Sequence, residues 1–213
     1  MSLTFPLTDL IDRMLVKTCE FDLDFNQDIS LAGDGGLWVK DLAPPLWQAK
    51  LTSNELVHAK ALQCQALYNA MGGSLQTFLA WNPLAPYPQA DPSGTILGAS
   101  TVKIHTVDSG MVLLRLKGLP VGYVVTLGDF LCFDYGAGPS RAFHQIAETA
   151  VADGTGVTPL FQIAPPLRTG AAADQIVTLK KPAALMRMRP KSFKIGNTSR
   201  MKSVVSFEAV QVL

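Results

Sequence analysis

The spacing most typical of a metal site is Asp22-x-Asp24-x-Asn26-x-Asp28, which is similar to the start of a calcium-binding loop. A calcium loop needs glycine at its sixth position and glutamate at its twelfth, where this chain has Gln27 and Gly33. Apolar and polar residues alternate strictly from residue 21 to residue 26, which favours a half-buried strand with acidic side chains on its wet face. We therefore expect a strand here and no metal.

Other catalytic patterns are incomplete in this sequence. The histidines His58, His105 and His144 are far apart, and none has a second ligand at metal spacing. The segment from Gly136 to Arg141 is glycine-rich, but Arg141 stands where a dinucleotide-binding loop needs its third glycine, and a hairpin loop explains the segment better. We expect no enzyme, no cofactor and no metal.

The charges are few and unevenly distributed. Charged residues make up 16% of the 213 residues, against a usual share of roughly 25%, which suggests that part of the surface is covered by other subunits. Residues 1–100 carry a net charge of −5 and residues 101–213 a net charge of +6. A basic stretch over residues 180–202 supplies the expected contacts with a neighbouring subunit or another partner: Arg187, Arg189, Lys191, Lys194, Arg200 and Lys202. Its only aromatic residue is Phe193, which argues against a nucleic-acid module.

Targeting signals are missing from the N-terminal segment. Asp9 and Asp12 interrupt the stretch that a signal peptide would keep apolar, and no apolar run approaches the roughly 20 residues that span a bilayer. Cys19, Cys64 and Cys132 are scattered, which is typical of reduced thiols. We expect a chain that is made in the cytoplasm and is not inserted into a membrane.

The expected secondary structure is mainly β with one good helix. Thr52 and Glu55 form a capping box that predicts a helix over residues 53–71, ended by Gly72-Gly73. A proline- and glycine-rich linker follows over residues 82–98. Beyond it, strands recur at the spacing of a small barrel or sandwich, with a three-residue hairpin loop at residues 108–110 and a long last strand over residues 203–212.

Two groups of short motifs follow one another along the chain. The first group is a tryptophan-bearing strand, a capped helix, a glycine turn and a phenylalanine-bearing strand, over Trp47 to Glu55, Leu67, Gly72-Gly73 and Phe78. The second group is a series of turns and a proline-containing exit, at Leu127-Gly128-Asp129, Asp153 to Gly156, Ile163 to Arg168 and Val177 to Pro182. In their order and spacing, the two groups resemble the distal tail proteins (Dit-like) of long-tailed bacteriophages and prophages.

This resemblance implies a β-rich α+β fold with a tail-tube-like β-sandwich, one flanking helix and a small barrel of OB-like type. The sandwich would comprise residues 1–84 and 183–213, and the barrel residues 85–182. The resemblance further implies a structural virion protein whose hexameric ring connects the tail tube protein to the hub or baseplate, with DNA only passing through its channel. Because a sliding channel should not bind phosphates, we expect a neutral or acidic lining, with Asp22, Asp24 and Asn26 as candidates and the basic segment facing elsewhere.

Two alternatives remain open. The chain could be another tail-tip component, such as a hub or fibre-attachment protein. It could also be a carbohydrate-binding module for host-surface adhesion, with Trp38, Trp47 or Trp81 as exposed sugar platforms. We favour core or interface positions for these three residues, because they lie in or beside strongly apolar stretches outside the expected barrel.

Overall fold

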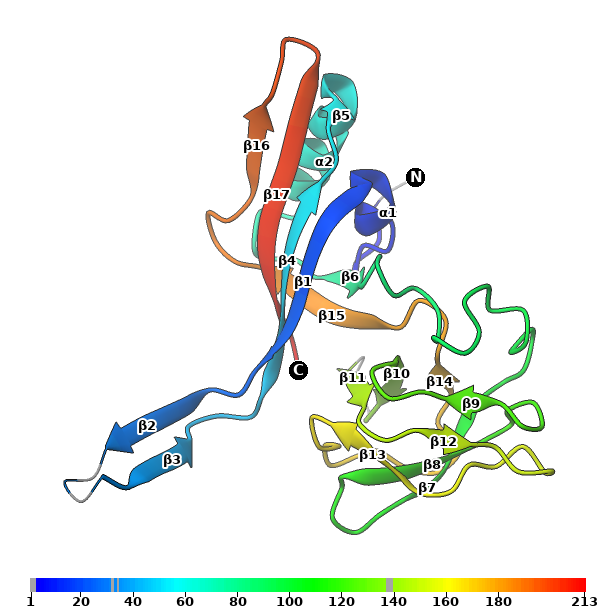
Figure 1. Cartoon of the computed structure of the whole chain (residues 1–213). Coiled ribbons are helices and arrows are strands. Elements are labelled where there is room, and N and C mark those ends of the chain that lie inside the picture. The colour runs from blue at the N-terminus through cyan, green and yellow to red at the C-terminus, as the bar shows by residue number, and fades with distance from the viewer. Residues whose placement is uncertain (1–2, 32, 34, 137–139) are drawn as a thin grey trace. The chain divides into compact units, whose positions relative to one another are not determined.

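The computed structural model describes residues 3–31, 33, 35–136 and 140–213, and it confirms a mostly β protein (Figure 1). Strands take up 43% of the chain, and the described part holds two helices, α1 (Leu10–Met14) and α2 (His58–Ala70). The chain divides into two compact units, which we call the sheet unit (residues 12–77 and 186–212) and the barrel unit (residues 1–11, 78–185 and 213). These units differ in bounds from the predicted domains, because residues 1–11, 78–84 and 183–185 group with the barrel.

The sheet unit is built around the long last strand, β17 (Lys202–Gln211). On one side it pairs antiparallel with β4 (Leu46–Ser53) and β5 (Leu56–Val57), and β4 pairs in turn with β1 (Val16–Asp24). On its other side β17 pairs with β16 (Lys194–Asn197) and with the end of β15 (Ala183–Met188). The described part of this unit therefore has one main sheet with a helix, where the resemblance implied two sheets packed as a sandwich.

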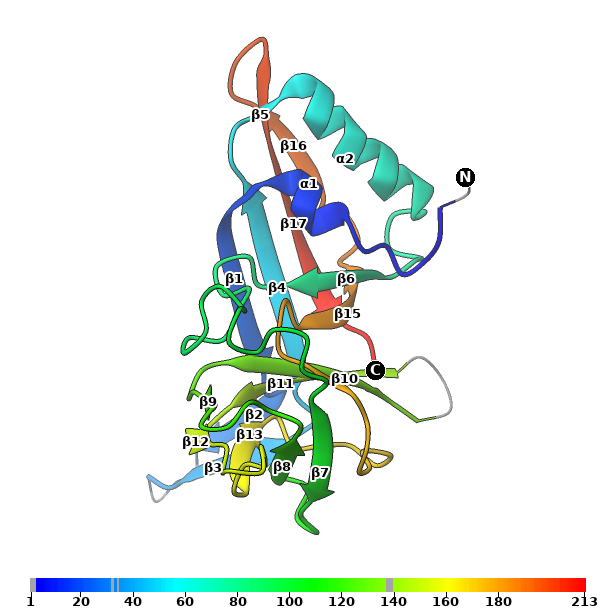
Figure 2. The same cartoon turned by 90° about the vertical axis from the view of Figure 1, so that its right-hand side faces the viewer.

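Apolar and polar side chains alternate along the strands of this sheet, so one face is buried and the other is exposed. Trp47, Leu51, Val205 and Phe207 are almost fully buried on the first. The helix α2 lies over that same face, where the Nδ1 atom of His58 lies 2.8 Å from the buried Ser203 hydroxyl (Figure 2). The helix thus supplies the cover that a sheet with one apolar face requires.

The predicted start of the helix at residue 53 is wrong. The helix begins at His58, and no side chain caps its first turn. Thr52 and Ser53 belong to β4 instead, where the Ser53 hydroxyl accepts a hydrogen bond of 2.9 Å from the Val205 amide. Pairing with β17 satisfies backbone groups that the capping box would have satisfied, so tertiary contacts override the local signal. The predicted stop is confirmed, because both glycines after Met71 have positive φ.

A separate two-stranded hairpin extends from β1 and β4. Its strands are β2 (Gln27–Leu31) and β3 (Leu37–Asp41), paired antiparallel from Gln27↔Asp41 to Leu31↔Leu37. We call residues 25–42 the arm. Positions 32 and 34, between its two strands, lie outside the described residues.

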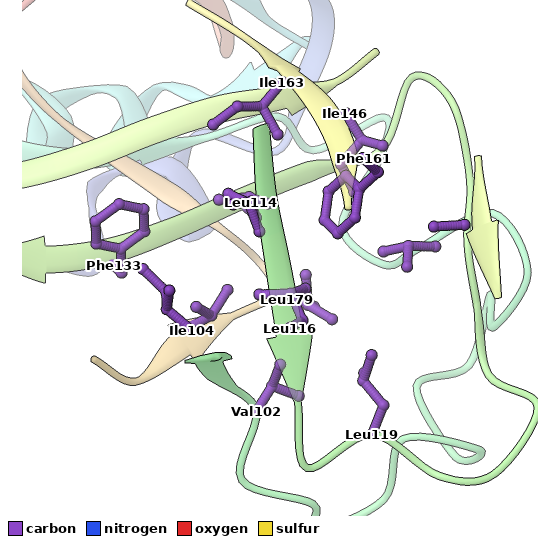
Figure 3. Close-up of a cluster of buried hydrophobic side chains, with 14 of the residues drawn as sticks. Val102, Ile104, Leu114, Leu116, Leu119, Phe133, Ile146, Phe161, Ile163 and Leu179 are labelled. Atoms are coloured by element: carbon purple, nitrogen blue, oxygen red, sulfur yellow. The ribbon is translucent and has the colours of Figure 1, made fainter. Parts of the chain in front are cut away.

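The barrel unit contains a six-stranded antiparallel sheet in the order β14-β10-β11-β13-β8-β7. Its strands are β7 (Lys103–Val107), β8 (Leu113–Lys117), β10 (Phe130–Tyr135), β11 (Ser140–Ile146), β13 (Phe161–Ala164) and β14 (Val177–Thr178). The first and last strands are joined by a bridge between Lys103 and Ile176 and by a 3.0 Å hydrogen bond from the Ile104 amide to the Gln175 carbonyl. The sheet is therefore a nearly closed barrel, packed inside with apolar side chains such as Leu114 and Phe161 (Figure 3).

Two details of the barrel differ from the expectation. An OB fold has five strands, whereas this barrel has six. The β7–β8 connection spans residues 108–112 rather than three residues, with Met111 at φ +58°. The predicted hairpin loop at residues 136–141 does join β10 and β11, but residues 137–139 lie outside the described part.

The remaining elements of the barrel unit are short. β9 (Val124–Val125) pairs with β12 (Ala150–Val151), and β6 (Phe78–Trp81) forms a parallel bridge from Phe78 to Leu7. The predicted linker at residues 82–98 is irregular but folded as part of this unit. The buried Asp91 carboxylate accepts hydrogen bonds from the Ile96 and Leu97 amides, at 3.2 and 2.9 Å.

Candidate interaction surface on the sheet

The exposed face of the sheet unit carries charged and polar side chains from five strands or strand ends. We call it the charged face, and it comprises Glu20, Asp22 and Asp24 of β1, Gln48 and Lys50 of β4, Glu208 of β17, Arg187 of β15, Arg189 after β15, and Lys194 of β16. The pairing Glu20↔Lys50↔Glu208 shows that these side chains share one side of the sheet, opposite to the buried Trp47 and Phe207. Part of this face is a shallow hollow lined by Asp22, Asp24 and Arg189 among others.

Charge changes sign across this face. The outermost strand on one side, β1, contributes the acids Glu20, Asp22 and Asp24, and its one base, Lys17, lies at the irregularity between Val16 and Thr18. The opposite side, formed by β15, β16 and the loop between them, contributes only bases: Arg187, Arg189 and Lys194. Lys50 and Glu208 lie between the two sides. The face is thus nearly neutral as a whole but polar from edge to edge.

A glutamine links the two sides. Arg189 donates a hydrogen bond of 2.7 Å from Nη2 to the Gln48 Oε1 atom, and Gln48 donates from Nε2 to the Asp24 carboxylate. Lys50 forms an ion pair of 3.5 Å with Glu20. The sequence placed the acidic lining and the basic contact residues on different surfaces, whereas the structure brings Asp22, Asp24, Arg187 and Arg189 to the same face. Gln48 was missed, although the polar positions of 46–53 alternate.

Not every predicted residue belongs to this face. Asn26 follows β1 and has φ +48°, and its Nδ2 donates to the Pro44 carbonyl at 3.1 Å, so it fixes the base of the arm. Lys202 pairs with Glu55 at 2.9 Å, and this bond and charge lower the pKa of Glu55. Arg200 is exposed in the turn between β16 and β17, and Lys191 is exposed in the loop before β16.

Both outer strands on these two sides have an unpaired edge. Within the described residues, β1 pairs only with β4, and β16 pairs only with β17. An unpaired edge offers a row of backbone donors and acceptors to another chain. The acidic character of the β1 edge also affects Cys19, whose pKa is raised to about 12 by burial and then by the charges of Asp22 and Glu20.

Two of the three tryptophans, Trp47 and Trp81, are engaged within the chain. Trp47 is 2% exposed in the core, and the ammonium of Lys181 lies 4.5 Å from the ring centre of Trp81. Trp38 is 72% exposed on the arm, so it does not lie in the core, and an interface position for it stays a prediction. Phe193 stacks on Tyr68 of α2 with centroids 4.4 Å apart, which leaves it engaged within the sheet unit.

No three metal-binding side chains gather in the described part of the chain. His144 is buried in the barrel, with Nδ1 bonded to the Pro165 carbonyl at 2.8 Å. Among the same residues, no helix combines the length and apolarity needed to cross a bilayer.

The charged face and its two open edges are therefore the candidate functional site. This arrangement can bind another protein surface of complementary charge, and an edge strand can extend a neighbouring sheet. No known family model matches this chain, and no curated protein matches its sequence.

Proposed function

We propose that the chain is a structural subunit that joins copies of itself head to tail into a closed ring, and that the ring is a connector in a phage tail tip. The observation that carries the self-assembly is the opposite charge of the two open edges, acidic at β1 and basic at β16. The phage role rests on the resemblance of the sequence motifs to distal tail proteins.

Edges of opposite charge favour a contact between two different surfaces rather than a symmetric dimer. When two copies meet edge to edge, β1 on β1 would bring Glu20, Asp22 and Asp24 against the same three acids. The contact of β1 with β16 of the next copy instead places these acids near Lys191 and Lys194. After one such head-to-tail contact, one copy still has a free β1 edge and the other a free β16 edge. Further copies add at these free edges until the first and last copies meet and close a ring.

The charged face would line the central channel in this proposal. It holds four acids and four bases, namely Glu20, Asp22, Asp24 and Glu208 against Lys50, Arg187, Arg189 and Lys194. Arg189 and Lys50 are already engaged with Gln48 and Glu20. A balanced lining of this kind lets DNA pass without holding its phosphates. It also replaces the acid-only lining expected from sequence.

Charge exchange between the edges tests the assembly. Variant A carries Glu20→Lys and Asp22→Lys, and variant B carries Lys191→Glu and Lys194→Glu. We expect the wild type to form rings visible by negative-stain microscopy, and we expect A alone and B alone to stay monomeric in sedimentation velocity. An equimolar mixture should form rings again, because each altered edge then meets its complement. Only a ring with an even number of subunits can alternate A and B, as a hexamer does.

The matched control is Glu148→Lys, a charge reversal at an exposed position of the barrel unit, which should leave assembly unchanged. A wild type that stays monomeric at high micromolar concentration would refute self-assembly. Variants that assemble as well as the wild type, or a mixture that fails to assemble although both variants are folded, would refute the edge contact. A reconstruction of the ring with Asp22 and Asp24 turned away from the lumen would refute the channel lining.

A further inference from the structure

The arm exposes an unusual amount of apolar surface. All ten residues of β2 and β3 are exposed, and they include Leu31 at 81% and Trp38 at 72%. Its register places Ile29 opposite Val39 and Leu31 opposite Leu37, so these four side chains share one face of the hairpin. At about 120 Å² of apolar area for each such side chain, this face leaves roughly 300 Å² in water. The other face carries Trp38 and Ser30.

The arm is also weakly supported within its own chain. Its base is held by the Leu42 amide, which donates to the Asn26 carbonyl at 2.9 Å, and by Gln27, which donates to the Asp41 carboxylate at 2.8 Å. A two-stranded hairpin with both faces in water is only marginally stable. Apolar faces and open strand edges together are typical of a segment that another chain covers.

Charge identifies the occupant. The arm contains three acids and one base, whereas residues 194–202 contain three bases and no acid. The basic residues surround exposed apolar side chains, because Met201 is 72% exposed and Val57, which pairs with Lys202, is 59% exposed. We call residues 194–202 together with Val57 the basic end of the sheet unit. Its combination of apolar centre and basic rim matches the apolar, acidic arm.

The arm cannot reach the basic end of its own chain. β1 starts beside Ser53, close to the basic end, and runs to Asp24 beside Leu46, where the arm begins. Nine residues of strand separate the two ends by roughly 30 Å. Figures 1 and 2 show the arm continuing away from the β16–β17 turn. The basic end that covers the arm must therefore belong to another copy.

We propose that the arm of one copy docks on the basic end of a second copy, with the Ile29–Val39 face on Met201 and Val57. This inference rests on the proposed self-assembly and adds a second contact to it.

Removal of the apolar face tests the arm without disturbing the core. Ile29→Thr with Val39→Thr keeps residues that favour strands but removes exposed apolar surface. We expect the apparent dissociation constant of self-association to rise roughly tenfold or more, with an unchanged circular dichroism spectrum and melting temperature. The control is Leu75→Thr, which removes a side chain that is 75% exposed elsewhere in the sheet unit and should have no effect.

A photo-crosslinker in place of Leu37, which lies on the same face of the arm as Ile29 and Val39, identifies the surface that receives the arm. The full-length protein with this substitution is mixed with ¹⁵N-labelled wild type, so that crosslinks between copies are recognised by mass. We expect crosslinked peptides from residues 194–202 or from around Val57 of the labelled copy. Crosslinks between copies that map to any other segment would overturn the assignment.

The outcomes separate this inference from the proposed function. If the wild type assembles and the arm variant assembles equally well, the arm inference is wrong and the ring proposal stands. If the charge-exchange mixture fails but the arm crosslinks as expected, the edge contact is wrong and arm docking stands. If the wild type never associates, both are wrong.

Discussion

His144 makes the stability of the barrel depend on pH. Its side chain is 3% exposed, stacks on Phe133 with ring centres 5.8 Å apart, and is bonded through Nδ1 to the Pro165 carbonyl. Burial lowers the pKa of His144 from 6.5 to about 4; the Pro165 bond raises this pKa and the charge of Arg168 lowers it. The native barrel thus holds the neutral imidazole.

The sign and size of the effect follow from this pKa. Below pH 6.5 the unfolded chain binds a proton at His144 that the folded barrel does not bind, so the free energy of unfolding falls as the pH drops from 6.5 towards 4. Above pH 6.5 the neutral imidazole contributes its full stabilisation. A pKa of about 4 against 6.5 corresponds to a loss of about 3 kcal/mol. Few small domains tolerate such a loss without partial opening.

His144→Asn provides the comparison, because an asparagine amide can still donate to Pro165 but does not titrate. We expect the variant to be less stable than the wild type at pH 7, and the gap to shrink by about 3 kcal/mol at pH 4. Urea unfolding followed by hydrogen exchange of residues 130–146 reports the barrel itself. Imidazole signals of the wild type in NMR give the pKa directly. A His144 that titrates near 6.5, or equal pH dependence in both proteins, would show the reasoning to be wrong.

Three further predictions concern a glycine turn, a thiol and the assembly. Gly156→Ala should destabilise the barrel by about 2 kcal/mol, because Gly156 has φ +76° and a Cβ there would collide with the Leu119 carbonyl oxygen; Gly154→Ala, with open space around it, should be nearly neutral in the same urea titration. Cys19 should react slowly with iodoacetamide at pH 8 because its pKa is raised to about 12, and Asp22→Asn should speed the reaction measured by mass spectrometry; an equal rate would remove the role of the carboxylate. Ring formation should weaken between about 0.1 and 1 M salt, where the screening length falls from roughly 10 to 3 Å; sedimentation that is independent of salt would argue against charged edges.

Much of the β architecture could be predicted from short patterns. The last strand was predicted within one residue at each end. The glycines after the helix and the linker at 82–98 also interrupt regular structure where expected. These signals act over a few neighbouring residues, and no pairing with a distant strand opposes them at these positions.

Other elements depend on partners far along the chain. β16 has a weak sequence pattern, Lys-Ile-Gly-Asn, and forms because β17 offers it a ladder. The capping box at Thr52 fails for the same reason, since Thr52 pairs with Ser206. The first strand of the arm was not predicted either, because its apolar residues stay in water and gain no burial within this chain.

The sequence by itself determined that this protein is mostly β, has one long helix and ends in a small barrel followed by a long strand. It also determined the division of charge between an acidic first half and a basic second half. Only the tertiary structure decided where those charges meet. Asp24, Gln48 and Arg189 lie far apart in the chain and come together because β1, β4, β17 and β15 pair in one register. That register is set by the burial of Trp47, Leu51 and Phe207 on the opposite face, since a slip of one residue would expose all of them.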